Sequence, residues 1–188
     1  NQANTYLRGT NSVTELLSTT WNQSPYYNSL CPGGSVTGCV ATAMAQIMKF
    51  WNYPSHGYGI HSYNEDDYGT LTANFGATTY NWTSMPNTVT SSNSSVATLM
   101  YHCGVSVDMN YSPTFSGAWV ISDNPKDKEK CAEYALKTYF GYKSSLSGKQ
   151  KSNYTEAQWI SLLKTELDAS RPIIYAGWES GGGGHCFI

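Results

Sequence analysis

The part of the sequence that decides the fold runs Gly38-Cys39-Val40-Ala41-Thr42-Ala43-Met44-Ala45-Gln46-Ile47-Met48-Lys49-Phe50-Trp51-Asn52-Tyr53-Pro54. Its apolar residues recur at helical spacing, in a background rich in Ala and Met that favours helix. The pattern predicts a helix over 39–51, which Pro54 would close. Cys39 therefore stands where a loop meets the first turn of a strong helix.

A thiol at a helix start is suited to nucleophilic chemistry. Unpaired N–H groups and the helix dipole stabilise an anion there, and the thiolate is the reactive form of cysteine. Gly38 would let the chain turn tightly and keep the sulfur open to substrate. Taken alone, a cysteine is more often a small buried apolar residue, so the surrounding sequence has to decide between the two interpretations.

Length and composition favour a globular protein with no nucleic-acid or membrane partner. The 188 residues, 40% hydrophobic and 13% charged, suffice for one buried domain or for two small lobes around a cleft. A net charge of -2 without runs of like charge gives no electrostatic footprint for nucleic acid or anionic lipid. Fifteen Tyr and six Trp, with few Lys and Glu, favour a secreted protein.

The five cysteines indicate neither a zinc site nor a full set of disulfides. No CxxC pair or Cys/His cluster has metal-ligand spacing, and an odd number of thiols cannot all pair within the chain. The sequence does not decide the state of the four cysteines other than Cys39, which are Cys31, Cys103, Cys131 and Cys186.

Four further helices are predicted from periodicity and capping residues. A capping box of Ser12 and Glu15 predicts a short helix that ends before Trp21. The others are expected over 94–103, over 127–140, and from Thr155 through 167, the last with Gln158 completing a capping box. The remaining segments of the first half are read as long polar, aromatic-rich loops.

A β-rich segment follows Pro172. The runs 173–176 and 186–188 are β-branched and aromatic and predict paired strands. The glycines that join them, Gly183 and Gly184 among them, allow the backbone to approach a ligand closely, and His185 begins the returning strand. Strand alternation turns the next residue, Cys186, away from the face that His185 uses, so we expect a buried thiol there.

His185 is the histidine whose setting suits presentation into a cleft. His56 and His61 lie in a loop rich in Tyr and Gly, where exposed imidazoles are expected. His102 neighbours Cys103 near a helix end, but adjacent helical residues face different directions, so a capping or surface role is expected.

The residues around these positions resemble the streptopain family of cysteine peptidases, from about Leu16 onward. The matching motifs are Trp21-Asn22-Gln23, Pro25-Tyr26-Tyr27-Asn28, the stretch 38–54, Tyr80-Asn81-Trp82, Leu99-Met100, Gly104-Val105-Ser106-Val107-Asp108-Met109-Asn110-Tyr111, Phe140-Gly141-Tyr142 and Gly183-Gly184-His185. Such a long match favours Cys39 as a nucleophile. The 146 residues between Cys39 and His185 also fall within the range of about 130 to 150 typical of papain relatives.

The resemblance implies an α+β, papain-like fold with two lobes around a substrate cleft. A mainly helical lobe over about 11–140 would carry Cys39, and a β-rich lobe from about 141 would carry His185, within one catalytic domain over 1–188. The family's Asn-Trp-Gly-Trp-Gly-Gly segment after the histidine is absent from these residues. We therefore expect the β-rich lobe to be incomplete here and to need a C-terminal remainder.

The resemblance also implies a mechanism and partners. Cys39 would attack a peptide carbonyl to form a thioester, His185 would move the proton, and the side-chain amide of Gln23 would donate to the oxyanion beside the Cys39 N–H. No cofactor or metal is needed. Protein or peptide substrates are expected, with an apolar side chain at the second position before the scissile bond, as are an inhibitory prosegment and a secreted or cell-surface location in a bacterium.

Two alternatives keep the scaffold but change the function. The first is a non-catalytic binding or adhesion module that exposes Tyr and Trp, against which the intact set of Gln23, Cys39 and His185 argues. The second is a papain-like acyl transferase of the transglutaminase type, which the specific match around Cys39 disfavours.

Overall fold

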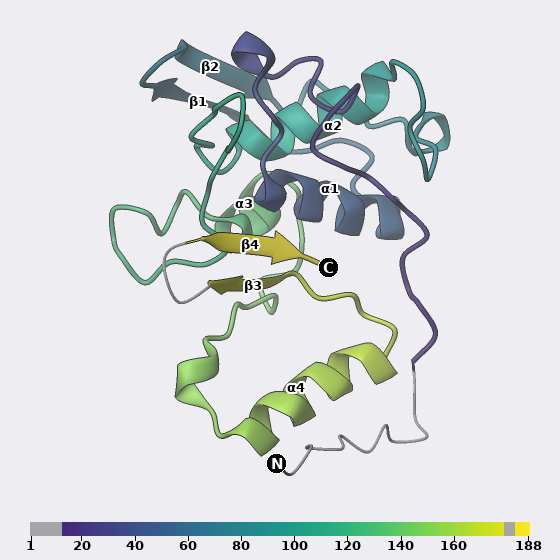
Figure 1. Ribbon diagram of the computed structural model, residues 1–188, viewed down its shortest axis with the longest axis vertical. Helices are drawn as coiled ribbons and strands as arrows, with labels where there is room; N and C mark the ends of the chain where they lie inside the picture. The colour runs from purple at the N-terminus through teal and green to yellow at the C-terminus, as the bar shows by residue number, and fades with distance from the viewer. Residues whose placement is uncertain (1–12, 179–182) are drawn as a thin grey trace, which may run out of the picture.

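A computed structural model describes residues 13–178 and 183–188 (Figure 1). The described part contains four α-helices and two antiparallel pairs of strands. In chain order they are α1 (Cys39–Trp51), β1 (Ile60–Glu65), β2 (Gly69–Asn74), α2 (Ser94–Val105), α3 (Ala132–Thr138), α4 (Glu156–Asp168), β3 (Tyr175–Trp178) and β4 (Gly184–Phe187). Single 3-10 turns lie at Pro32–Gly34, Trp82–Ser84 and Lys151–Asn153. The mixed α+β class predicted from the sequence is confirmed.

Helix α1 is the centre of the core. It contacts α2, α3 and β4, and eight of its thirteen residues are buried. In Figure 1 it crosses the middle of the molecule, with α2 and the β1–β2 hairpin on one side and β4 on the other. The predicted bounds of 39–51 are confirmed, although Asn52 ends the helix in a left-handed conformation, two residues before Pro54. A helix buried this thoroughly fixes the position of its first residue, Cys39.

The strands β1 and β2 form a hairpin that the sequence analysis missed. They pair antiparallel from Ile60 opposite Asn74 to Glu65 opposite Gly69, where a loop with exposed histidines was expected. His61 is not a free surface imidazole, because its Nε2 lies 2.6 Å from Asp108 Oδ1. Strand β1 is rich in polar residues, so the alternation of apolar and polar residues that predicts a strand is weak in its sequence. Only one face of the hairpin is covered by the core.

The helix predicted over 94–103 is present as α2, but the capping or surface role expected for His102 is wrong. The helix begins after Asn93, whose side chain accepts a hydrogen bond from Val96 N–H, and it continues through Gly104 to Val105. His102 is 7% exposed and its Nδ1 lies 2.9 Å from the hydroxyl of Tyr80. Burial lowers the pKa of His102 to about 4, which makes it a neutral core residue rather than a cap or a surface group.

Two predicted helices are wrong in whole or in part. Residues 13–20 form no helix; Thr20 N–H instead donates to the carbonyl of Asn87, which draws this segment along the core, and Ser12 lies outside the described residues. The helix expected over 127–140 begins only at Ala132. Before it, the Asn124 carbonyl accepts from the N–H groups of Asp127 and Lys128, so a turn replaces the first helical residues.

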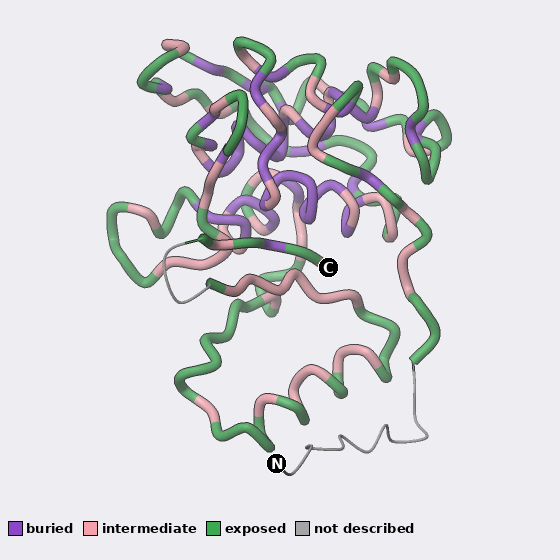
Figure 2. Tube along the Cα trace, viewed as in Figure 1, coloured by how far each residue is buried: buried purple, intermediate pink, exposed green. Residues whose placement is uncertain are grey.

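From Thr155 onward the chain contains the predicted helix and strand pair. Thr155 caps α4 and forms the expected capping box with Gln158. The predicted strand pair is found as β3 and β4, but β3 begins two residues after the expected 173 and β4 begins two residues before the expected 186. The strands pair antiparallel, with Ala176 opposite Cys186 and Gly177 opposite His185. Figure 2 shows that burial concentrates around α1, whereas α4 has no fully buried residue.

None of the helices in the described ranges is long and apolar enough to cross a bilayer.

Candidate active site

Cys39 is the first residue of α1, and the turn before it is fixed by close packing. Gly38 has φ +85°, a left-handed conformation that favours glycine, and a Cβ added there would lie 2.7 Å from Met109 Sδ. Thr42 Oγ1 donates to the Gly38 carbonyl at 2.9 Å and lies 2.8 Å from the buried Thr37 hydroxyl. These contacts fix the start of α1, and Cys39 stands at the N-terminus of the helix, where the helix dipole favours an anion.

The other thiols are less accessible than Cys39. All five cysteines are free, and Cys39 alone among them is not buried. Burial raises the pKa of Cys31 and of Cys186 to about 12, and it also raises the pKa of Cys103. Since a thiolate is needed for attack, Cys39 is the thiol best placed to act as a nucleophile.

Gln23 lies against the turn that precedes the thiol. Its carbonyl accepts a hydrogen bond from Thr37 N–H at 3.2 Å, two residues before Cys39, and its side chain is half-buried. The segment leading to it is tied to α1, because Thr19 Oγ1 and Trp21 N–H both donate to Gln46 Oε1, at 2.9 and 3.3 Å. The structure therefore brings Gln23 to the start of the helix.

His185 lies on the strand that packs against α1. Its neighbour Cys186 is 5% exposed and belongs to the buried cluster against which Cys39 packs. His185 is exposed, as expected from strand alternation with the buried Cys186, and no hydrogen bond between the described residues joins its ring to Cys39. In Figure 1 β4 runs directly below α1. The fold therefore brings the strand of the histidine to the helix of the cysteine.

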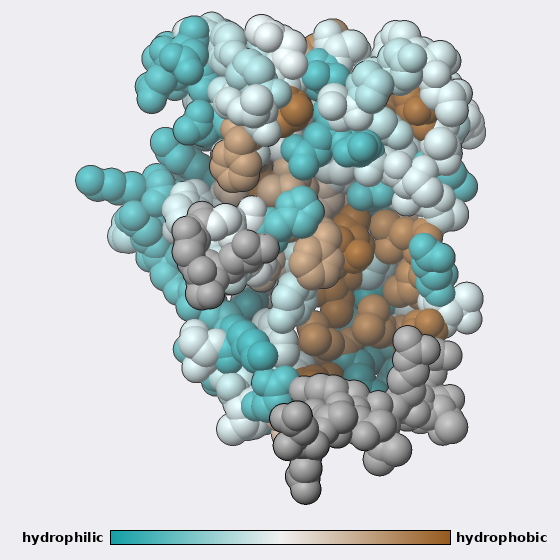
Figure 3. All heavy atoms as spheres, in the orientation of Figure 1, coloured by the Kyte–Doolittle hydropathy of each residue, from teal (hydrophilic) through white to brown (hydrophobic). Residues whose placement is uncertain are grey.

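The exposed face of β3 and β4 forms an open hollow of about 360 Å³. It is lined by Gly177, Trp178, Gly183, Gly184, His185 and Phe187. His185 and Phe187 stack with their ring centroids 6.4 Å apart, while Trp178 and Phe187 are 68% and 52% exposed. The predicted substrate-binding glycines Gly183 and Gly184 thus line the hollow beside His185, while Gly38 is buried behind Cys39. Figure 3 shows further apolar side chains gathered near the end of β4.

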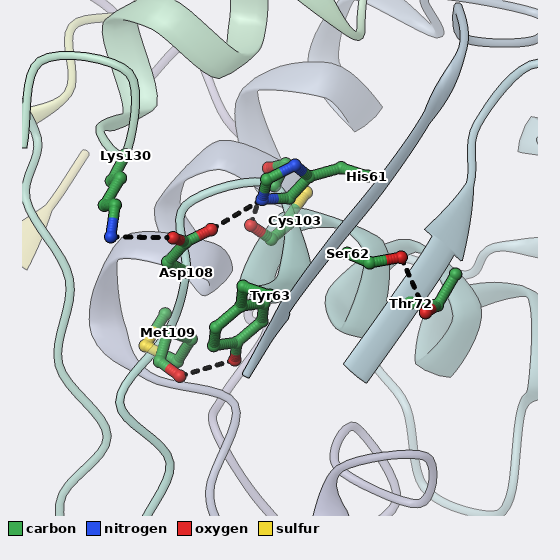
Figure 4. A network of polar contacts seen from close by, with 9 residues as sticks. His61, Ser62, Tyr63, Thr72, Cys103, Asp108, Met109 and Lys130 are labelled. Carbon is green, nitrogen blue, oxygen red and sulfur yellow. Dashed lines mark hydrogen bonds and ion pairs between the residues drawn. The ribbon is translucent and has the colours of Figure 1, made fainter. Parts of the chain in front are cut away.

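A polar network behind the nucleophile turn was given no role in the sequence analysis (Figure 4). Asp108 is 13% exposed and accepts from His61 Nε2, and it pairs with Lys130 Nζ at 3.2 Å. Residues 106–108 form a turn directly after α2, with Asp108 at φ +48°, and no local pattern in the sequence indicated the partners of its carboxylate.

No trio of His, Cys, Asp or Glu side chains within residues 13–178 and 183–188 is arranged to hold a metal ion.

Comparison with known proteins identifies the class of this fold and site. Two solved chains from Prevotella intermedia, active interpain A and a prointerpain A fragment, each superpose with a TM-score of 0.78 at 35% identity over 93% of this chain. This chain covers 74% of the former and 56% of the latter. Both belong to the class of cysteine proteases or their precursors.

Sequence comparison gives the family. Residues 21–188 match the model of the Peptidase C10 family, and the chain belongs to this family. It is 34% identical over 181 residues to the thiol protease/hemagglutinin PrtT of Porphyromonas gingivalis, and 32% identical over 166 residues to streptopain of Streptococcus pyogenes. These matches cover 89% and 82% of this chain but only 20% and 39% of those bacterial proteins. The resemblance to streptopain is confirmed.

Proposed function

We propose that this protein is a cysteine endopeptidase in which Cys39 is the nucleophile and His185 the proton acceptor. The observation that carries the proposal is the position of Cys39, the one thiol that is not buried, at the N-terminus of a helix against which the strand of His185 packs. Membership of the Peptidase C10 family supports the same chemistry.

The proposed reaction is acyl transfer through a thioester. The Cys39 thiolate attacks the carbonyl carbon of a peptide bond, and the developing oxyanion accepts hydrogen bonds from the Cys39 N–H and the Gln23 side-chain amide. His185 protonates the leaving amine, and the peptide bond breaks. A water molecule that gives its proton to His185 then cleaves the thioester, releasing the acid and the free thiol.

The finer predictions on architecture and partners belong to the same proposal. They comprise one domain over 1–188 with a papain-like pair of lobes, and an apolar preference at the second position before the scissile bond. The open hollow beside His185 supports an extended peptide as substrate. A solved relative is named as a pro-form, which supports an inhibitory prosegment here. Secretion, and a C-terminal remainder that completes the second lobe, stay predictions.

Selective labelling tests the proposal in the full natural chain. An epoxide inhibitor of cysteine peptidases should modify Cys39 and none of the four buried thiols, as read by mass spectrometry of peptides. Cys39→Ala and His185→Ala should each lower peptide hydrolysis by roughly 10⁴-fold or more, since a nucleophile and its base act as a unit. Labelling spread over several thiols, or hydrolysis that survives both substitutions, would contradict the proposal.

A binding or adhesion function is the competing proposal. The printed name of PrtT includes hemagglutinin, and this chain exposes large aromatics such as Phe115 and Trp119. The chain covers 20% of PrtT, so that name describes a much longer protein. The Cys39→Ala variant separates the two functions, because adhesion should survive it and hydrolysis should not.

A further inference from the structure

The network around Asp108 joins three separate parts of the chain behind Cys39. Asp108 follows α2 with φ +48°, and its carboxylate accepts a hydrogen bond from His61 Nε2 of β1 at 2.6 Å. Because a carboxylate only accepts, this ring nitrogen must carry a proton. On the other side, Lys130 Nζ approaches from the segment before α3. Figure 4 shows the two partners on opposite sides of the carboxylate.

The next residue transmits this anchoring to the nucleophile turn. The Met109 carbonyl accepts a hydrogen bond from the Tyr63 hydroxyl at 2.6 Å. The Met109 N–H donates to the Gly104 carbonyl at 3.1 Å. The Met109 side chain is fully buried and lies where a side chain at Gly38 would be. Met109 is therefore the surface against which the residue before Cys39 packs.

The segment that continues from Met109 also backs the turn. Asn110 and Gly117 exchange backbone hydrogen bonds of 2.9 and 3.0 Å, which folds this segment back on itself. The Ser116 hydroxyl then donates to the Val36 carbonyl at 2.7 Å, and Val36 N–H donates to the Ser112 carbonyl at 3.2 Å. Residues 36–38 thus rest on residues 109–117, and Asp108 anchors the near end of that support.

We propose that Asp108, held between His61 and Lys130, is a positioning residue that sets the Cys39 sulfur through Met109 and Gly38. This inference rests on the proposed function and deepens it. Displacing a nucleophile by about 1 Å can lower the rate roughly 10²-fold. The contact between Met109 and Gly38, the residue before Cys39, therefore affects catalysis. Because Asp108 acts through Met109 and Gly38, its loss is expected to lower kcat and to leave KM almost unchanged.

The first test compares Asp108→Asn with Asp66→Asn in the full natural chain. Asp66 is an exposed residue of the β1–β2 turn, so its substitution removes the same charge without touching the network. Asp108→Asn is expected to lower kcat about 10-fold with KM within about 2-fold of the parent. The rate of Cys39 alkylation by iodoacetamide should fall by a similar factor across its pH profile, whereas Asp66→Asn should match the parent in both measurements.

A second test uses Lys130, which is half exposed and therefore tolerant of substitution. Lys130→Met should lower kcat and the alkylation rate in the same direction as Asp108→Asn, and Lys130→Arg should restore both because it keeps the ion pair. Lys128→Met, an exposed charge removal two residues away, is the matched control.

The outcomes separate this inference from the proposed function. If the parent's Cys39 is alkylated no faster than its buried thiols, the proposed function is overturned and this inference with it. If the parent is reactive and all Asp108 and Lys130 variants match it in kcat and alkylation, only the inference is overturned, even when their melting temperatures fall. If Lys130→Arg does not rescue what Lys130→Met loses, the ion pair has no positioning role and the inference also fails.

Discussion

The two catalytic candidates stand on regions of different construction. The α1 region, residues 21–142, contains nearly the whole core, and its helices and hairpin bury each other. In the β4 region, residues 143–178 and 183–188, Cys186 alone among the described residues is fully buried. Cys39 therefore has a rigid support, while His185 lies on a two-stranded sheet that is open on its outer face.

Similar mutations are therefore expected to have different consequences in the two regions. A change in the α1 region disturbs a contiguous core, so it lowers global stability and also moves the helix start that carries Cys39. A change in the β4 region is expected to loosen that region locally, because few buried contacts couple it to the remainder.

The largest effect is expected at the turn before Cys39. Gly38→Ala places a methyl group against Met109 and within 3.1 Å of the Ser116 carbonyl, in addition to the strain of φ +85°. A shift of the helix start by about 1 Å would lower kcat by roughly 10²-fold. Gly34→Ala is the matched control, since its φ is +73° but no atom lies within 4 Å of the added Cβ. Equal kcat values for the two variants would show that the Met109 contact does not position Cys39.

The second prediction compares one substitution in both regions. Leu99 of α2 is fully buried, so Leu99→Ala should cost about 2 to 5 kcal/mol of unfolding free energy through the cavity that it leaves. Leu163 of α4 is half-buried, and Leu163→Ala should cost about 1 kcal/mol or less. Urea unfolding of both variants measures the difference. Equal costs would mean that α4 belongs to the same cooperative core.

The difference between local and long-range contacts also explains which elements could be predicted from the sequence. Strong patterns gave α1 and the capped helix α4 almost to the residue, because helical periodicity and capping residues act within one or two turns. The paired strands β3 and β4 followed from β-branched runs on either side of a glycine loop. Residues 179–182 of that loop lie outside the described residues.

The missed features depend on contacts between distant residues. The helix expected after Ser12 is absent from residues 13–20, where Thr19 and Thr20 hydrogen-bond to the distant residues Gln46 and Asn87. The partner of His61 is 47 positions away at Asp108, and no local pattern in the sequence links them. Gln23, Cys39 and His185 were placed by resemblance; the structure brings Gln23 to the turn before α1 and packs β4 against that helix. Their catalytic roles stay predictions.

A buried histidine provides the third prediction, on pH. Burial lowers the pKa of His102 from 6.5 to about 4, so the unfolded chain binds a proton there at a pH where the folded chain does not. The contribution of neutral His102 to the free energy of unfolding is therefore complete above pH 6.5 and is lost as the pH falls to about 4. The pKa difference corresponds to about 3 kcal/mol. Urea unfolding between pH 7.5 and 4.5 should show a steeper loss of stability for the parent than for His102→Gln. Parallel pH dependences would contradict the prediction.

The smallest predicted effect tests whether α4 unfolds independently. Thr155→Ala removes the hydroxyl that accepts from Gln158 N–H and leaves the backbone half of the capping box, whereas Asn93→Ala removes the side chain that caps α2. Each substitution should cost about 1 kcal/mol at its own helix. After Thr155→Ala, amide hydrogen exchange should accelerate in α4 alone, because the half-buried face of that helix couples weakly to the core. After Asn93→Ala, exchange should accelerate in α1 and α2 together, since these helices pack against each other. Faster exchange in α1 after Thr155→Ala would mean that α4 and the nucleophile helix share one cooperative unit.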